Sequence, residues 1–344
     1  MKRRQAIFLL GLATVSGGLA IACSNQTPNT ANVGGGTNSQ ELTIYSGRSK
    51  KLIDPLIQQF QQKTGIKTQI RYASTAELAA TIQEEGKNSP ADVFFAQDAG
   101  ALGAIQKAGL ATKLPDKFLN QVEPRFHSPD GMWVGISGRV RTLDYNTKLV
   151  KPTDLPNTVV GLTEAKWKGK VGWAPSNGSF QAFVTALRVS VGEAKAKQWL
   201  EAMKANDTKV YENNVQILEA LSKGEVTVGL VNHYYLEELK KENPQVPVAH
   251  HFLNDVGSMV NVAGVAILNT SKHREAADKL VEFLLTPEAQ KYFAEETYEY
   301  PLADGVKPAT NVKSLAEIKT PKLDLSNLDD LKGTLKLLEQ TGVL

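Results

Sequence analysis

Short apolar runs alternate with stretches of helical periodicity in the first third of the chain, and this alternation narrows the choice of fold more than any other feature. Leu52, Leu56 and Phe60, for example, recur at the spacing of one helix face. The connections are short, and strands that alternate with helices in this way form a mostly parallel α/β sheet. The predicted strands are 42–45, 67–72 and 91–95, and the predicted helices are 50–64, 77–85 and 99–108.

The same pattern continues after an extended passage at 133–145, which leads into a second unit. A chain of 344 residues with 42% hydrophobic residues is long enough for about two domains. A further helix begins at Leu236. The other predicted strands are 170–173, 226–231 and 260–268, and the other predicted helices are 181–190, 193–204, 214–221, 275–285, 287–295 and 327–340.

Residues 1–22 differ from all that follow and predict export from the cytoplasm. A basic start precedes a short apolar run and small residues, which is the pattern of a signal peptide, and the run is too short for a spanning helix. Arg3 and Arg4 also resemble a twin-arginine signal, with an ordinary basic start as the alternative. Cys23, the only cysteine, resembles the acylated residue of bacterial lipoproteins, and the polar, Gly-rich residues 23–40 predict a flexible tether.

The charge of the exported chain gives no support to a nucleic-acid partner. The whole sequence has 39 Lys and Arg against 36 Asp and Glu. The leader holds three basic residues and no acidic ones, so its removal leaves 36 of each sign. A protein that binds the phosphate backbone carries a clear basic excess, and this chain does not.

Two tyrosines mark the most informative of the loops that follow predicted strands. Ligands of open α/β sheets bind where strands end and helices begin, here at 46–50, 96–100 and 232–235. Tyr234 and Tyr235 lie in the third loop, where the unpaired N–H groups of a helix start favour a phenolate. Hard oxygen donors select hard cations, so paired phenolates suit Fe(III) better than Zn(II) or Cu(I). The alternative is one core ring beside one half-exposed ring.

A second polar group precedes the predicted helix 181–190. Asn177, Gly178 and Ser179 present successive backbone N–H groups, which suit a small anion. The alternative is a simple helix cap, because Asn and Ser are preferred at that position. The sequence thus predicts either an anion site or a cap here.

Seven short tags occur in a fixed order along the chain: YSGRS from Tyr45, TGIK from Thr64, SPADVFF from Ser89, SGRVR from Ser137, GWAPSNGSF from Gly172, GLVNHYY from Gly229 and EYPL from Glu299. Together they resemble the periplasmic ferric-ion-binding proteins of iron ABC importers. The resemblance implies a two-lobed α/β binding protein of type II, with crossover strands near Arg139 and Gly264 and the ligand in the interlobe cleft. The implied lobes are 41–139 plus 265–315 and 140–264 plus 316–344.

The resemblance also implies the site. Tyr234 and Tyr235 map onto two Fe(III) ligands, and a synergistic carbonate or phosphate completes the coordination. An arginine suits that oxyanion because its planar fork donates paired hydrogen bonds. The anion contacts map onto Asn177, Gly178, Ser179, Asn214, Asn232 and either Arg48 or Arg139.

The chain departs from the family at the remaining ligand positions. Ser49 and Gln97 stand where some members have a His and a Glu, and Ser179-Phe180 stands where others have a third tyrosine. Asp98 is expected either to accept a hydrogen bond from a metal-bound water or to cap a helix. With two assured protein ligands, we expect a weaker and more exchangeable iron site. We expect His233 to point away from the site and to be partly exposed, and His127, His250 and His251 to be surface residues.

The leading prediction is therefore a monomeric solute-binding protein that captures ferric iron in the periplasm or on the outer face of the inner membrane. Its implied partners are an ABC permease and its ATPase, with membrane attachment only through the acylated Cys23. The alternative is the same fold binding an organic anion, such as a phosphonate, without metal. An exported enzyme is disfavoured, because the sequence lacks a Gly-x-Ser-x-Gly elbow and a His-Glu-x-x-His motif.

Overall fold

The structure is a computed structural model that describes residues 41–309 and 312–344. The predicted signal peptide, Cys23 and the tether lie outside the described residues. Within the described ranges, no helix is long and apolar enough to span a bilayer. The described residues belong to one compact unit.

The first strand group has the predicted strand–helix alternation. β1 (Glu41–Ser46), β2 (Lys67–Tyr72) and β3 (Val93–Ala96) are parallel in the order β2-β1-β3, and helices follow each strand. The apolar face of α1 packs Ile53, Leu56 and Phe60 into the core, as its periodicity predicts. The helices of the first part of the chain are α1 (Lys50–Thr64), α2 (Thr75–Glu85), α3 (Ala99–Lys107) and α4 (Asp116–Leu119).

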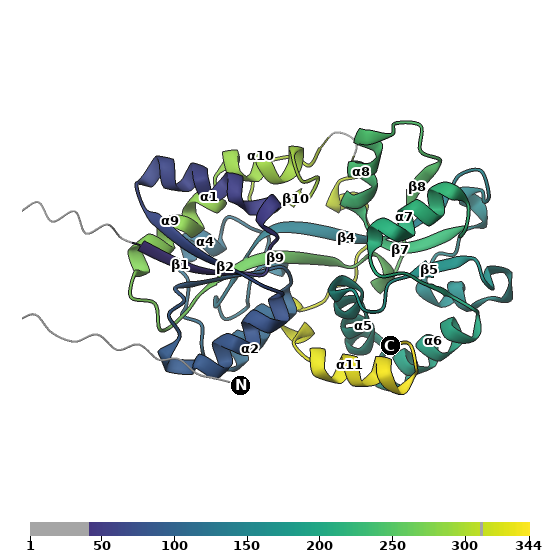
Figure 1. The fold of residues 1–344 in the computed structure, drawn as a ribbon, viewed down its shortest axis with the longest axis horizontal. Coiled ribbons are helices and arrows are strands. Elements are labelled where there is room, and N and C mark those ends of the chain that lie inside the picture. Colours follow the sequence, from purple (N-terminus) through teal and green to yellow (C-terminus); the bar gives the residue numbers. More distant parts are fainter. Residues whose placement is uncertain (1–40, 310–311) are drawn as a thin grey trace, which may run out of the picture. The chain divides into compact units, whose positions relative to one another are not determined.

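Two long buried strands cross the centre of the sheet side by side (Figure 1). β4 (Val134–Asn146) pairs antiparallel with β9 (Val260–Ile267) up to Val140, and from Arg141 it pairs antiparallel with β7 (Val228–Asn232). β9 in turn pairs antiparallel with β3. The sheet was predicted to be mostly parallel, and this is wrong at its centre. There, β4 and β9 run antiparallel to the strands beside them.

The second strand group is built on the other half of β4. β7 pairs parallel with β5 (Val171–Trp173), which pairs parallel with β6 (Lys209–Val210), while β8 (Val248–His251) adds antiparallel to this half of β4. β10 (Tyr300–Pro301) pairs antiparallel with the first half of β4, at Ser137 and Gly138. The order is thus β2-β1-β3-β9-β4-β7-β5-β6. The helices of this part are α5 (Gly178–Val191), α6 (Glu193–Ala205), α7 (Asn214–Lys223) and α8 (His233–Glu242).

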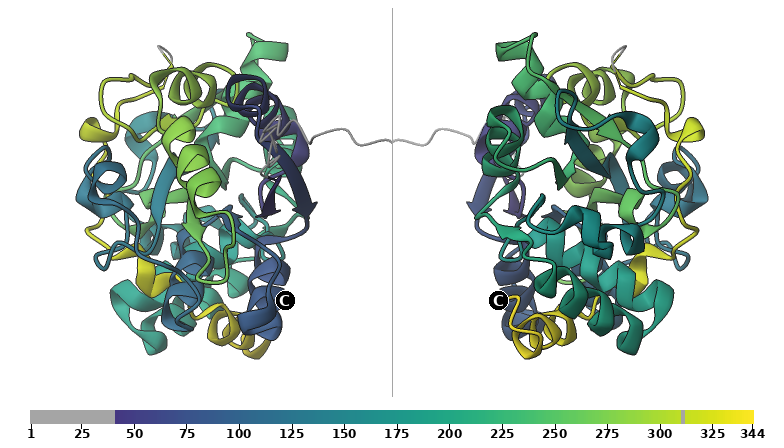
Figure 2. Two further views of the ribbon diagram at one scale, coloured as in Figure 1. Left: turned by 90° about the vertical axis from the view of Figure 1, so that its left-hand side faces the viewer. Right: turned by 90° about the vertical axis from the view of Figure 1, so that its right-hand side faces the viewer.

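The chain ends in three helices, α9 (Arg274–Leu284), α10 (Pro287–Glu295) and α11 (Leu331–Gln340). α11 lies beside α5 (Figure 1 and Figure 2), and the hydroxyls of Thr185 and Thr334 hydrogen-bond at 2.7 Å. The predicted helix 327–340 begins later, since Asp330 caps it by accepting from the backbone N–H of Gly333. The C-terminus therefore packs on the second strand group.

Two helices begin three residues earlier than predicted, and both differences concern the site. α5 begins at Gly178 rather than 181, and α8 begins at His233 rather than Leu236. In each case the polar residues that were expected in the loop belong to the first helical turn. Their backbone N–H groups are therefore among those that a helix leaves unpaired.

Candidate functional site

A cavity of about 550 Å³ lies where strands of both groups end. Each of the three loops singled out in the sequence contributes to its wall. Among the helices that begin at this wall are four that carry most of its polar residues, namely α2, α3, α5 and α8. The lining residues from these segments include Gly47, Ser49, Ser74, Thr75, Ala76, Gln97, Asp98, Ser176, Asn177, Gly178, Ser179, Asn232, Tyr234 and Tyr235.

The four helix starts make the cavity favourable for negative charge. Each start carries unpaired N–H groups and a partial positive charge from the helix dipole. Side chains cap three of them: Ser74 accepts from Glu77, Asp98 from Ala101 and Asn177 from Ser179. At α8 the N-cap residue makes no side-chain capping bond in the described structure, so the first turn that carries the tyrosines keeps its donors.

Tyr234 and Tyr235 lie in that first turn with their rings against each other. The ring centroids are 4.3 Å apart and the planes are inclined by 33°. Tyr234 is 7% exposed and Tyr235 is partly exposed, and both line the cavity. The alternative of one core ring beside one half-exposed ring thus describes the burial, but both rings also reach the cavity.

The pKa of Tyr234 lies well above that of a free phenol. Burial is the main cause and the neighbouring Tyr235 adds to it, while the positive charge of Arg139 acts in the opposite direction. The phenol is therefore protonated at neutral pH unless a cation displaces its proton. Across residues 41–309 and 312–344, no group of three or more His, Cys, Asp or Glu side chains is placed to hold a metal ion.

Two buried arginines of β4 lie beside the tyrosines. Nη1 of Arg139 donates to the carbonyl of Gln97 at 2.5 Å, and Nη2 of Arg141 donates to Oγ of Ser179 at 3.3 Å. Nη1 of Arg141 is buried without a partner among the described residues. Burial, and then the charge of Arg139, lower the pKa of Arg141 to about 9. Two guanidinium groups held this close and out of water favour an anion between them.

Aromatic rings support the second of these arginines. The guanidinium carbon of Arg141 lies 5.6 Å from the ring centroid of Phe180 and 5.2 Å from that of Phe183. Phe180 is 1% exposed, and its ring meets that of Trp173 edge-on at 5.5 Å. Phe180 therefore packs beneath the arginine instead of facing the cavity.

Arg48 is engaged elsewhere. Its guanidinium forms a buried ion pair with Glu299, in which Nη1 lies 3.0 Å from Oε1 and Nη2 contacts Oε2. Nη1 also donates to Oε1 of Gln97 at 2.7 Å. Arg139 lines the cavity and Arg48 does not. Of the two arginines that the resemblance offered as an anion contact, the geometry favours Arg139.

Most, but not all, of the asparagines and the serine of the predicted anion site lie on the cavity wall. Oδ1 of Asn177 accepts from the backbone N–H of Ser179 at 3.0 Å and from its hydroxyl at 2.6 Å, so Asn177 is the helix cap and also lines the cavity with Gly178. Asn232 lines the cavity as well. Asn214 is buried at the start of α7, outside that lining, and its Nδ2 has no partner within the described ranges.

Three further predicted residues line the cavity. Ser49 precedes α1 and makes no side-chain capping bond in the described structure, which leaves its hydroxyl at the wall. Oε1 of Gln97 is occupied by Arg48. Asp98 caps α3 through Oδ1, which accepts from the backbone N–H of Ala101 at 3.0 Å. The capping alternative given for Asp98 is therefore present in the structure.

The exposure expected for two histidines is wrong, although His233 does lie outside the cavity lining, as expected. His233 is 1% exposed and bonded to backbone groups on both sides, and burial lowers its pKa to about 3. His250 lies between two buried carboxylates, with Nδ1 2.6 Å from Asp144 and Nε2 3.1 Å from Glu237. Burial alone would lower the pKa of His250, but these carboxylates outweigh it and raise that pKa to about 9.

Sequence reasoning missed Arg141 and the start of α2 as parts of the cavity region. Arg139 and Arg141 are two residues apart on a strand, and this spacing places both side chains on one face. Ser74 precedes Glu77 by three residues directly after a predicted strand, which is the signature of a capped helix start. Both signals were present in the sequence.

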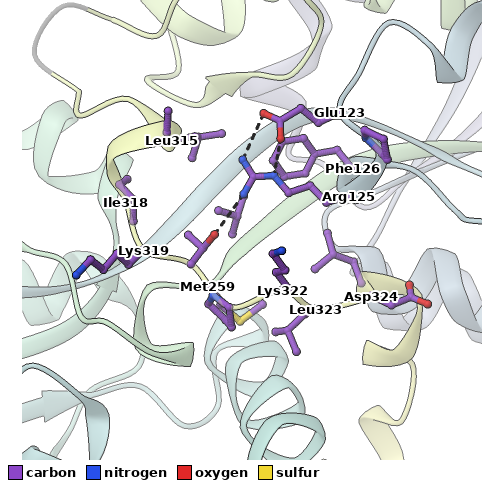
Figure 3. A pocket seen from close by; sticks show the side chains of 16 residues that line it. Glu123, Arg125, Phe126, Met259, Leu315, Ile318, Lys319, Lys322, Leu323 and Asp324 are labelled. Atoms are coloured by element: carbon purple, nitrogen blue, oxygen red, sulfur yellow. Dashed lines mark hydrogen bonds and ion pairs between the residues drawn. The ribbon is translucent and has the colours of Figure 1, made fainter.

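A larger cavity than the candidate site lies elsewhere (Figure 3). It measures about 980 Å³ and lies between the segment 315–325 and the start of β9. Its walls are mainly apolar, and Nε of Arg125 is paired with Glu123 at 2.8 Å. No tyrosine is among its described lining residues, so it lacks the donors that distinguish the smaller cavity.

Known proteins similar to this chain share its fold. A model of the bacterial extracellular solute-binding protein family matches residues 55–320. The major ferric iron-binding protein of Neisseria meningitidis serogroup B is 32% identical over 334 residues, and the alignment covers 94% of this chain and 97% of the relative.

Two solved structures resemble the chain over most of its length. Iron-bound HitA from Pseudomonas aeruginosa is 36% identical with a TM-score of 0.82, and the match covers 88% of this chain and 99% of HitA. IdiA (FutA) of Trichodesmium, solved with iron and citrate, is 32% identical with a TM-score of 0.77 over 88% of this chain and 99% of that one. These structures confirm the predicted two-lobed α/β fold.

Proposed function

The chain belongs to the bacterial extracellular solute-binding proteins, among their periplasmic ferric-ion-binding members, and we propose that it captures ferric iron and delivers it to an ABC importer. The observation that carries this proposal is the position of Tyr234 and Tyr235. Their phenols meet in the first turn of α8, on the wall of a cavity where helix starts and buried arginines gather. Relatives named as ferric iron-binding proteins support the choice of metal.

Tyr234 and Tyr235 are the proposed protein ligands of Fe(III). Burial keeps the phenol of Tyr234 protonated in the absence of metal, so binding requires a cation strong enough to displace the proton. A trivalent hard cation meets that requirement better than a divalent one. Because the iron and the proton compete for the same phenol oxygen, iron binding becomes weaker as pH falls.

A small oxyanion, carbonate or phosphate, completes the proposed coordination. Arg139, Arg141 and the start of α5 at Asn177–Ser179 surround the position that it would take, with Asn232 beside them. The unpartnered Nη1 of Arg141 supports this, because buried polar groups in proteins nearly always have a partner. An oxygen of the anion would provide one.

The residues at which this chain differs from the family determine how tightly the proposed site holds iron. Ser49 and Gln97 line the cavity where other members have ligands, and Phe180 faces away from it. Two phenolates and a bidentate anion leave two positions of the octahedron to water. We therefore propose an iron site that exchanges readily, with Asp98 placed to accept a hydrogen bond from bound water.

Delivery requires that the site open and close. We propose residues 41–139 and 265–315 as one lobe and 140–264 and 316–344 as the other, with β4 and β9 as the crossover strands. The exchange of strand partners at Val140 and Arg141 supports this boundary. Closure shields the bound iron from bulk water, and opening, together with exchange of the anion, releases the iron to the permease and its ATPase.

The proposed location follows from the leader and the relatives. A relative from Serratia marcescens is named an Fe(3+)-binding periplasmic protein. Export by residues 1–22 and acylation of Cys23 would hold the chain as a monomer at the outer face of the inner membrane. The metal-free alternative, in which an organic anion is the ligand, has less support, because the relatives named above bind iron.

Calorimetric titration of the iron-free protein with ferric citrate tests the proposal. We expect tight binding only when bicarbonate or phosphate is present, because two phenolates alone do not fill the coordination sphere. Equally tight binding without either anion would show that further protein ligands, or the citrate of the titrant, complete the coordination. Binding of a phosphonate with no response to iron would favour the metal-free alternative.

A further inference from the structure

His233 forms two hydrogen bonds to backbone groups that belong to different parts of the fold. Its Nδ1 accepts from the N–H of Val140 at 3.2 Å, and its Nε2 lies 2.8 Å from the carbonyl oxygen of Tyr298. An imidazole that accepts at one nitrogen and donates at the other is neutral and carries its proton on Nε2. The two partners therefore fix both the tautomer and the orientation of the ring.

Val140 is the residue at which β4 changes partners. It is the last residue of β4 paired with β9, and Arg141 begins the pairing with β7. The backbone N–H of Arg141 donates to the carbonyl of Met259, whereas that of Val140 is taken by His233. The imidazole thus attaches the first residue of α8 to the proposed crossover point.

The second partner lies in a constrained segment. Tyr298 has a φ of +54°, a conformation that non-glycine residues rarely adopt. Such a backbone persists where surrounding contacts impose it. The bond to His233 is one such contact, and the ion pair of the next residue, Glu299, with Arg48 is another.

The imidazole also touches the ring of a proposed iron ligand. The ring centroids of His233 and Tyr234 are 5.7 Å apart with planes at 90°, and those of His233 and Tyr300 are 4.7 Å apart. A change in the orientation of the imidazole would therefore move Tyr234. The residue lies outside the cavity lining, so it does not act as a ligand in this arrangement.

We propose that His233 is a positioning residue for the tyrosine pair, which ties the first turn of α8 to β4 at the point where that strand passes between the two groups. The inference rests on the proposed function, in which Tyr234 and Tyr235 bind ferric iron. By this link, movement of the crossover strands changes the relative positions of the two phenols. Without the link, the phenols fit the metal less well and iron dissociates faster.

The test compares His233→Leu with His233→Gln in the full chain loaded with Fe(III) and bicarbonate. Leucine removes both hydrogen bonds, whereas the glutamine amide can accept and donate as the imidazole does. We expect the leucine variant to lose iron to excess EDTA at least about tenfold faster, with a shifted phenolate-to-iron band. The glutamine variant should stay within about threefold of the wild type.

Gln290→Leu is the matched control for general destabilisation. Gln290 is equally buried, donates to the carbonyls of Ile136 and Leu284, and accepts from the N–H groups of Leu302 and Ala303. This variant should melt at a lower temperature with an unchanged band and an unchanged rate of iron loss. If His233→Leu does not fold, His233→Asn replaces it, because its shorter amide cannot reach both partners.

The possible outcomes distinguish the proposed iron site from the proposed positioning role of His233. A wild-type protein that gives no visible band with Fe(III) and bicarbonate refutes the proposed iron site itself. A normal wild type, with His233→Leu releasing iron at the wild-type rate, refutes only the positioning role. The same refutation follows if Gln290→Leu accelerates release as much as His233→Leu does, or if His233→Gln loses iron as fast as His233→Leu.

Discussion

Nη2 of Arg141 lies 3.3 Å from the hydroxyl oxygen of Ser179, so the middle of β4 and the start of α5 meet beside the tyrosine pair. The contact joins a fixed positive charge to a helix start, and both favour an anion. Nη1 of the same guanidinium has no partner in the described part of the chain. In the proposed iron site, this arrangement would hold the small anion that completes the coordination.

Arg141→Lys should weaken the binding of the anion and leave the two tyrosine ligands in place. Lysine keeps a positive charge but lacks the planar fork, and it loses contact with Phe180 and Phe183. Iron loading at a fixed Fe(III) concentration should then need roughly tenfold more bicarbonate, since hydrogen bonds to charged groups contribute about 1.5 to 3 kcal/mol. Arg274→Lys, at a surface ion pair with Asp278, should leave the requirement unchanged. Equal bicarbonate dependence in both variants would remove Arg141 from the anion site.

Glu299→Gln should destabilise the fold strongly. The carboxylate pairs with Arg48 where both side chains are almost fully buried, so its neutral replacement leaves a buried positive charge uncompensated. Removal of one partner from such a pair costs about 3 to 5 kcal/mol. Urea unfolding measures this cost. The double variant Arg48→Met, Glu299→Leu should recover most of the loss, and a double variant as unstable as Glu299→Gln would contradict the assignment.

The protein should lose stability in alkaline solution as the buried imidazole of His250 loses its proton. Asp144 and Glu237 raise its pKa to about 9 in spite of burial, against about 6.5 for an unfolded histidine. A raised pKa means that the folded state holds the proton more tightly, so this contribution is complete below about pH 6.5 and is lost as pH rises through about 9. Lys240, 3.3 Å from Glu237, adds a positive charge to the same group.

His250→Gln tests that dependence. The variant should be less stable than the wild type near pH 6.5 and should lose less stability between about pH 6.5 and pH 9, as measured by urea unfolding at each pH. His251→Gln is the control, since the side chain of His251 contacts the carbonyl of Pro156 and no carboxylate in the described structure. A wild-type slope in His250→Gln would show that other groups cause the loss.

Much of the fold follows from local sequence patterns. The alternation of apolar runs and helical stretches predicted β1, β2, β3 and the helices after them, because each pattern reflects contacts within one segment. The strand-to-helix position of Tyr234 and Tyr235, and the cap at Asn177, were predictable for the same reason. Such signals require no knowledge of distant partners.

The remainder depended on contacts between distant segments. Arg48 and Arg139 are equally plausible anion contacts in the sequence, and only the pairing of Arg48 with Glu299, 251 residues away, separates them. The sequence predicts a partly exposed His233, because it does not show that β4 and the segment at Tyr298 enclose this side chain. The antiparallel centre of the sheet arises in the same way, since β4 pairs with strands far from it in sequence.

The visible absorption spectrum of the purified chain with Fe(III) and bicarbonate tests the central claim most directly. A phenolate-to-iron charge-transfer band should appear in the wild type, should weaken in Tyr234→Phe and in Tyr235→Phe, and should be absent when both tyrosines are replaced. A wild-type protein that stays colourless under these conditions, or a double variant that keeps the band, would contradict iron binding by the paired phenols.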